Sequence, residues 1–93
     1  MRYRLKITRT ARTELRRLPG HIRQRAAATI EDLARDPHPR DDRDAIELRG
    51  YPGLWRIVLD RWRIIYRIDD DALLILVVHI RKRGPRTYED LEG

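Results

Sequence analysis

The segment Trp62–Asp71, WRIIYRIDDD, constrains the fold of this chain more than any other stretch. Large side chains occupy every second position from Trp62 to Ile68, and arginine occupies most positions between them. Because successive side chains of a β-strand point to opposite faces of a sheet, this alternation predicts a strand with one buried and one exposed face. The three aspartates that follow predict a polar turn. The residues expected on the exposed face are Arg61, Arg63, Ile65 and Arg67.

The segments on either side predict two partner strands. Residues 54–59 alternate in the same way, with Arg56 and Val58 between large apolar side chains. A tight turn is expected near Asp60 and Arg61, so the two strands would form a hairpin. On the C-terminal side, LLILVVHI (73–80) is apolar at nearly every position. This run predicts an interior strand covered on both faces.

The N-terminal part of the chain predicts one more strand and two helices. Cationic and apolar side chains alternate in RYRLKI, which is typical of a strand. An apolar stripe at positions i, i+4 and i+7 then predicts a helix, which Thr8 or Thr10 can cap and Pro19-Gly20 ends. A second helix is expected from about His21 to Arg35.

Together these segments predict an α+β fold of order β-α-α-β-β-β. A helical hairpin would pack on one face of a small, mainly antiparallel sheet. The stretch 36–45 has no periodic pattern and is expected to be a loop between the helices and the sheet. At 93 residues, the chain is expected to form a single domain, 1–93, without room for a deep cofactor cavity.

The charge of the chain indicates an anionic partner. The net charge is +6, and the first 25 residues hold nine cationic side chains but one acidic side chain, Glu14. A basic excess favours phosphate contact and therefore nucleic acid. An acidic protein partner or an anionic membrane surface would fit the same excess.

Other compositional features argue against several classes of site. The chain has no cysteine, and its histidines, His21, His38 and His79, lack the spacing of metal ligands. No apolar run approaches the ~20 residues that span a bilayer. The N-terminus lacks the uninterrupted apolar core of a signal peptide. We therefore expect no metal, no cofactor and a soluble intracellular protein.

A series of short motifs carries a family resemblance. T-x-x-A-x-x-x-L-x-x-L-P spans residues 8–19, and L-x-x-D-P closes the second helix. E-L-R-G, W-R-I, WRIIYRIDDD and a final arginine cluster before Tyr88 follow in that order. In order and spacing, from Tyr3 to Tyr88, the chain resembles the RelE/ParE superfamily of type II toxins, and the RelE branch most closely.

This resemblance implies two different activities on one fold. RelE-type toxins are messenger-RNA endonucleases that act in the ribosomal A site, whereas ParE-type toxins block DNA gyrase without nuclease chemistry. Fold alone does not choose between them. The resemblance also implies a cognate antitoxin encoded by a neighbouring gene, operator DNA bound only through the antitoxin complex, ribosome and mRNA as targets, and a prokaryotic cytoplasmic location.

Metal-free RNA cleavage suits the residues present. The 2′-hydroxyl of RNA can attack the adjacent phosphate, so the protein must orient the reacting groups and neutralise developing negative charge. Arginines on rigid strands serve the charge requirement. Arginine is a poor proton donor, however, because its pKa lies far above neutral pH.

The resemblance assigns candidate roles to individual residues. Arg63 matches a phosphate-contacting arginine of RelE relatives; the alternative is an exposed residue of an amphipathic strand. Near the C-terminus we rank Arg83 ahead of Arg81 as a catalytic arginine and take Tyr88 as the tyrosine that stacks on or orients the substrate; the alternative is a solvated basic tail. The remaining RNA-binding candidates are Arg56, Arg61, Arg67, Lys82 and Arg86.

Three further positions carry open alternatives. His79 is either a general acid or, more commonly for its place at the end of an apolar strand, a structural histidine. Trp55 and Trp62 are interpreted as core residues, with base stacking as the alternative. Val58 departs from the family pattern, because ribosome-cleaving relatives often carry a second basic residue there. That departure keeps open a third function, an inactive toxin homologue that serves as an antitoxin-binding module.

Overall fold

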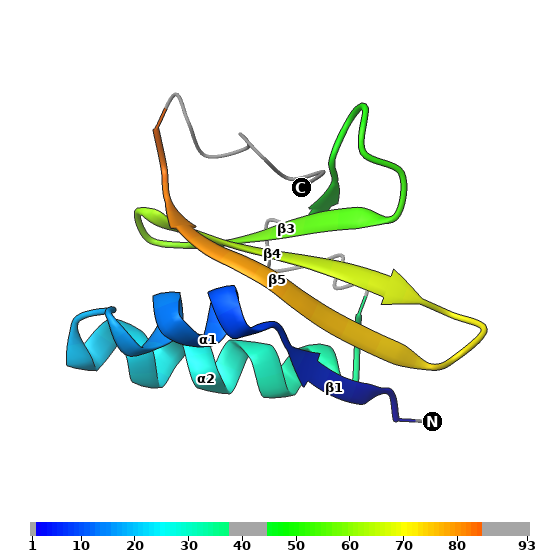
Figure 1. Cartoon of the computed structure of the whole chain (residues 1–93), viewed down its shortest axis with the longest axis horizontal. Helices are drawn as coiled ribbons and strands as arrows, with labels where there is room; N and C mark the ends of the chain where they lie inside the picture. The colour runs from blue at the N-terminus through cyan, green and yellow to red at the C-terminus, as the bar shows by residue number, and fades with distance from the viewer. Residues whose placement is uncertain (1, 38–44, 85–93) are drawn as a thin grey trace.

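The computed structural model describes residues 2–37 and 45–84, which form two helices on one face of a five-stranded sheet (Figure 1). The strands lie in the order β1-β5-β4-β3-β2, with β1 parallel to β5 and all other pairs antiparallel. The predicted α+β fold is confirmed. In chain order the elements are β1 (Arg4–Ile7), α1 (Arg9–Arg16), α2 (Gly20–Leu33), β2 (Ile46–Glu47), β3 (Leu54–Leu59), β4 (Trp62–Asp69) and β5 (Leu74–Lys82).

Two details differ from the sequence prediction. A two-residue strand, β2, pairs with Trp55 and Arg56 and adds one strand to the predicted order. So short a segment has no alternation to detect. The second helix begins at Gly20 and ends at Leu33, close to the predicted limits. Most of the expected loop 36–45 lies outside the described residues.

Local sequence explains where the helices begin. The Thr8 hydroxyl group accepts a hydrogen bond from the Ala11 N–H (3.1 Å) and caps α1, which decides between the two predicted caps. Pro19 is the N-cap residue of α2, where its fixed φ does no harm. The buried residues of the helical layer are Ala11 of α1, Leu18 between the helices, and Ile22, Ala26, Ile30 and Leu33 of α2.

The β3–β4 hairpin sets the register of the sheet. Leu59 pairs with Trp62, so the connecting turn has two residues, as predicted. Asp60 adopts a positive φ of 54° in that turn, a conformation that aspartate tolerates better than most residues. In the β4–β5 turn the positive φ belongs to Leu73 instead, while the Asp69 carboxylate accepts the Ala72 N–H (3.0 Å).

A bulge between β4 and β5 changes which side chains face the helices. Ile65 pairs with His79 but Tyr66 pairs with Val77, so Val78 is an extra residue in β5. Consequently Val77 and Ile80, three positions apart, both lie in the core beneath the helices. His79 and Arg81 therefore face away from the helices, on the face that we call the open face.

The open face carries a small apolar cluster of its own. Ile65 is fully buried there with Leu48 and Leu54, and Tyr51 and Val78 pack against them. The expectation that Ile65 lies on the outer face is right, but solvent does not reach it. Residues 48–53 fold over it, closed by a hydrogen bond from the Leu48 N–H to the Leu54 carbonyl (2.8 Å). Part of the expected cover over the apolar run 73–80 comes from this cluster.

Tyr66 links the core to the end of the helical layer. Its side chain is fully buried, and its hydroxyl group donates to the Pro37 carbonyl (3.1 Å). At the far end of the sheet the half-buried Tyr3 donates to the Asp70 carboxylate. That hydrogen bond, together with partial burial and the charge of Asp70, raises the pKa of Tyr3.

Replacing Tyr66 with phenylalanine should destabilise the protein by about 1–3 kcal/mol, because a buried carbonyl group loses its donor. The measurement is the free energy of unfolding in urea. Tyr3→Phe is the matched control, and its loss should be smaller because its hydrogen bond lies at the surface. Equal losses for the two variants would contradict this account of the core.

Candidate active site

The centre of the candidate site is a row of three residues across the open face. Val58 pairs with Arg63 on β4, and Arg63 pairs with Arg81 on β5. Directly paired residues of antiparallel strands have Cβ atoms about 4.5–5.5 Å apart, so two guanidinium groups emerge from neighbouring strands. We call Val58, Arg63 and Arg81 the basic row.

Arg63 bends toward the β3–β4 turn. One guanidinium nitrogen, Nη1, donates to the carbonyl groups of Trp62 (2.9 Å) and Asp60 (3.2 Å). Among the described residues both acceptors are neutral main-chain groups, so these bonds fix the side chain without neutralising its charge. The side chain is half-buried, which reduces solvent screening of that charge.

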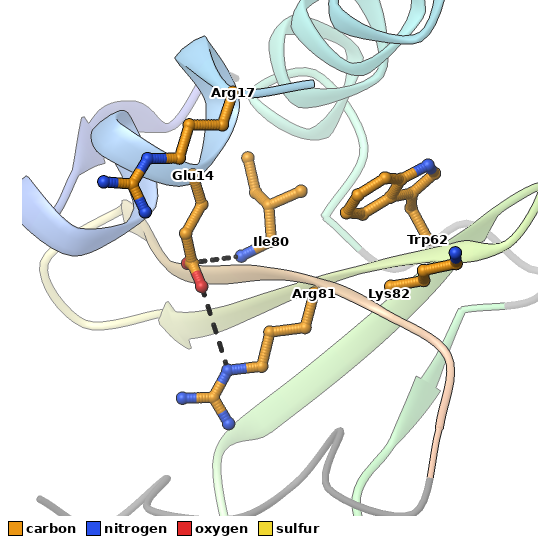
Figure 2. A pocket seen from close by; sticks show the side chains of 6 residues that line it. All are labelled: Glu14, Arg17, Trp62, Ile80, Arg81 and Lys82. Carbon is orange, nitrogen blue, oxygen red and sulfur yellow. Dashed lines mark hydrogen bonds and ion pairs between the residues drawn. The ribbon is translucent and has the colours of Figure 1, made fainter. Parts of the chain in front are cut away.

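Arg81 is held differently, by a carboxylate from helix α1 (Figure 2). Its Nε lies 3.9 Å from Glu14 Oε2, and its Nη2 lies 3.4 Å from His79 Nε2. The same Glu14 carboxylate accepts the Ile80 N–H (2.9 Å), and its Oε1 lies 3.5 Å from His79 Nδ1. Sequence reasoning gave Glu14 no role, although its isolation among nine cations was a signal.

The other predicted site residues, catalytic and RNA-binding, divide between the two ends of the sheet. Arg61, Lys82 and Arg83 are exposed beside the basic row, and the Arg83 N–H donates to the Arg61 carbonyl (2.6 Å). Arg56 lies one row further in, opposite Ile65. Arg67 lies four residues from Arg63 along β4, or about 13 Å. The predicted site residues Arg86 and Tyr88 lie outside the described residues.

Arg67 contacts a different part of the molecule from the rest. Its register partners are Leu54 and Leu76, and its Nη1 donates to the Pro52 carbonyl at 3.5 Å. It therefore supports the turn before β3, and the structure does not bring it to the basic row.

Trp62 is a core residue that also borders a hollow. Both tryptophans pack against the main core, as the sequence predicted. A hollow of about 300 Å³ lies between Trp62 and the end of α1, with Glu14 and Arg81 in its wall (Figure 2). A second hollow of about 450 Å³ shares Trp62 and Lys82 and reaches the start of α2. Cations thus surround a partly exposed indole beside the basic row.

Two further findings bear on the class of site. No group of three or more histidine or acidic side chains in residues 2–37 and 45–84 is arranged to hold a metal ion. Neither helix in the described part of the chain is long and apolar enough to cross a bilayer.

Comparison with known proteins identifies the family of this chain. A family model for the ParE toxin of the type II toxin–antitoxin system parDE matches residues 5–85. A RelE-like toxin protein of Escherichia coli is 31% identical over 85 residues, which cover 89% of this chain and 85% of that protein. The chain belongs to the RelE/ParE superfamily of toxins.

Solved structures of RelE toxins have a fold similar to that of this toxin. An archaeal RelE in complex with RelB, from Pyrococcus horikoshii OT3, superposes with a TM-score of 0.80 at 30% identity, covering 91% of this chain and 99% of that chain. The toxin–antitoxin complex RelBE2 from Mycobacterium tuberculosis gives a TM-score of 0.76 at 27% identity, covering 89% of this toxin and all (100%) of that chain.

Proposed function

We propose that this toxin is a metal-independent endoribonuclease that cuts messenger RNA on the ribosome and so inhibits translation. The observation that carries the proposal is the basic row, in which Arg63 and Arg81 face one side of the sheet from adjacent strands. The P. horikoshii and M. tuberculosis relatives, both RelE-type toxins, support it.

The cleavage chemistry follows from the charges. The 2′-oxygen attacks the neighbouring phosphorus and loses its proton, while the 5′-oxygen leaves and gains one. The products are a 2′,3′-cyclic phosphate and a 5′-hydroxyl end. The phosphorus passes through a five-coordinate state with added negative charge on its equatorial oxygens. Arg63 and Arg81 stabilise that state by charge-assisted hydrogen bonds in a partly desolvated setting.

Proton transfer is the weaker part of this site. A guanidinium group does not release a proton near neutral pH, and Val58 occupies the place in the basic row where a third cation would stand. We therefore assign orientation and charge stabilisation to the toxin and part of the proton transfer to the ribosome. Cleavage of naked RNA should accordingly be slow.

We further infer that a cognate antitoxin from a neighbouring gene inhibits this toxin, and that operator DNA is bound only through their complex. Two similar structures are RelE–RelB or RelBE complexes. The cations Arg61, Lys82 and Arg83 give an acidic antitoxin segment a complementary surface beside the basic row. A ribosomal target implies action in the prokaryotic cytoplasm.

Arg63→Ala should lower the rate of mRNA cleavage on the ribosome by about 10²–10³-fold, the usual effect of removing one preorganised charge-stabilising donor. Primer extension on mRNA after induction measures it, together with growth arrest. Arg35→Ala, an exposed arginine beyond the end of α2, is the control. Unchanged cleavage in Arg63→Ala would rule out this site.

Val58→Lys should increase the cleavage rate several-fold, because it restores a cation opposite Arg63 on the neighbouring strand. The readout is single-turnover cleavage of a ribosome-bound message. Val58→Leu controls for the change in side-chain size. If Val58→Lys cuts RNA more slowly than Val58→Leu, a cation at position 58 does not assist cleavage, and the proton moves by a path that does not need one there.

The match to the ParE family model supports a second candidate, inhibition of DNA gyrase without catalysis. In that case purified toxin should block gyrase supercoiling and leave ribosome-bound mRNA intact. We expect the reverse: intact supercoiling and cut mRNA. A toxin that does neither and still binds its antitoxin tightly would be the inactive homologue that Val58 suggests.

A further inference from the structure

The carboxylate of Glu14 makes three contacts, and all of them involve the last part of β5. It accepts the Ile80 N–H at 2.9 Å, approaches both nitrogen-bearing side chains that flank Ile80, and lines the hollow beside Trp62. Its side chain is 25% exposed and that of Arg81 is 21% exposed. Charges so placed are screened less than those of a surface pair.

We propose that Glu14 is a positioning residue that holds Arg81 in line with Arg63 on the open face. The catalytic meaning of this inference rests on the proposed endonuclease function, whereas the structural coupling of Glu14 to Arg81 does not. Glu14 does not touch the substrate in this scheme. It acts only through the arginine.

The position of the carboxylate follows from the sheet edge. Beyond Val77, β1 no longer pairs with β5, so the Ile80 N–H needs an acceptor from elsewhere. The hydrogen bond from Ile80 fixes Oε1, and the second oxygen then lies toward the Nε of Arg81. A long arginine side chain that is already oriented loses less conformational entropy when it binds a phosphate.

His79 joins the same arrangement. An arginine N–H that points to His79 Nε2 requires an unprotonated nitrogen there, so we assign the ring proton to Nδ1. Nδ1 is the atom that lies 3.5 Å from Glu14 Oε1. One carboxylate therefore favours the tautomer of His79 that accepts from Arg81, and both contacts direct the guanidinium group.

A purely structural role would not need the charge. The Ile80 N–H requires an acceptor oxygen, which the side-chain amide of glutamine also supplies. Glu14→Gln should therefore keep the edge of β5 closed and remove the attraction for Arg81. Glu14→Ala removes both the acceptor oxygen for Ile80 and the negative charge that attracts Arg81. Comparing its stability with that of Glu14→Gln therefore separates the effect of the hydrogen bond from that of the charge.

The first test does not depend on catalysis. In ¹⁵N-labelled toxin, the Nε–Hε group of Arg81 should give an ordered, slowly exchanging NMR signal. We expect Glu14→Gln to abolish that order while thermal unfolding remains close to that of Glu31→Gln. Glu31 is an exposed carboxylate of α2 and serves as the matched control. An unchanged Arg81 signal in Glu14→Gln would overturn the inference.

The second test is a double-mutant cycle on the cleavage rate. Glu14→Gln should slow single-turnover cleavage about tenfold, with little change in RNA affinity, and in the Arg81→Ala background its effect should fall below about twofold. Equal effects in both backgrounds would mean that Glu14 does not act through Arg81. If the wild-type toxin cuts no RNA but the NMR result holds, the proposed function fails and the coupling stands.

Discussion

The exchange of partners along the edge of β5 is the interaction on which the rest of this structure depends. The first half of β5 pairs with β1, but the register ends at Val77. From Val77 onward the hydrogen-bond partners of this edge come from α1 and its cap. The Thr8 N–H donates to the Val77 carbonyl (3.0 Å), and the Thr8 hydroxyl group donates to the Val78 carbonyl (3.1 Å). The Glu14 carboxylate accepts the Ile80 N–H. The capping residue of the helix and its single acid thus close an edge that would otherwise present unpaired polar groups.

That exchange has a functional consequence because it occurs next to the bulge. The extra residue Val78 reverses the parity of β5, so that Ile75, Val77 and Ile80 all face the helices. Without the bulge, Arg81 would share a face with Ile75 and Val77 and point into the core. With it, Arg81 reaches the open face opposite Arg63, and Glu14 approaches it from the side. Charge placement in this toxin is therefore a result of register as much as of composition.

Parts of the site follow from local rules and parts do not. The two-residue turn at Asp60 and the alternation of β3 and β4 place Val58 opposite Arg63, and both features are visible in the sequence. The prior ranking of Arg83 over Arg81 rested on spacing to a tyrosine outside the described residues. In the structure, Arg81 belongs to the basic row, whereas Arg83 is exposed beyond the end of β5. Glu14 is 66 positions from Ile80, and no local pattern joins them.

By itself the sequence determined the α+β class, the hairpin and the amphipathic helices, because each depends on periodicity, capping or turn chemistry within a few residues. The family was indicated instead by the resemblance of its motifs, in order and spacing, along the chain. Only the tertiary structure decided which face of β5 carries Arg81, that Ile65 is buried beneath residues 48–53, and that Glu14 bonds to the sheet edge. The physical reason is that a bulge and an edge contact are set by competition between packing and main-chain hydrogen bonding across distant segments. Neither the bulge nor the edge contact produces a periodic pattern in the sequence.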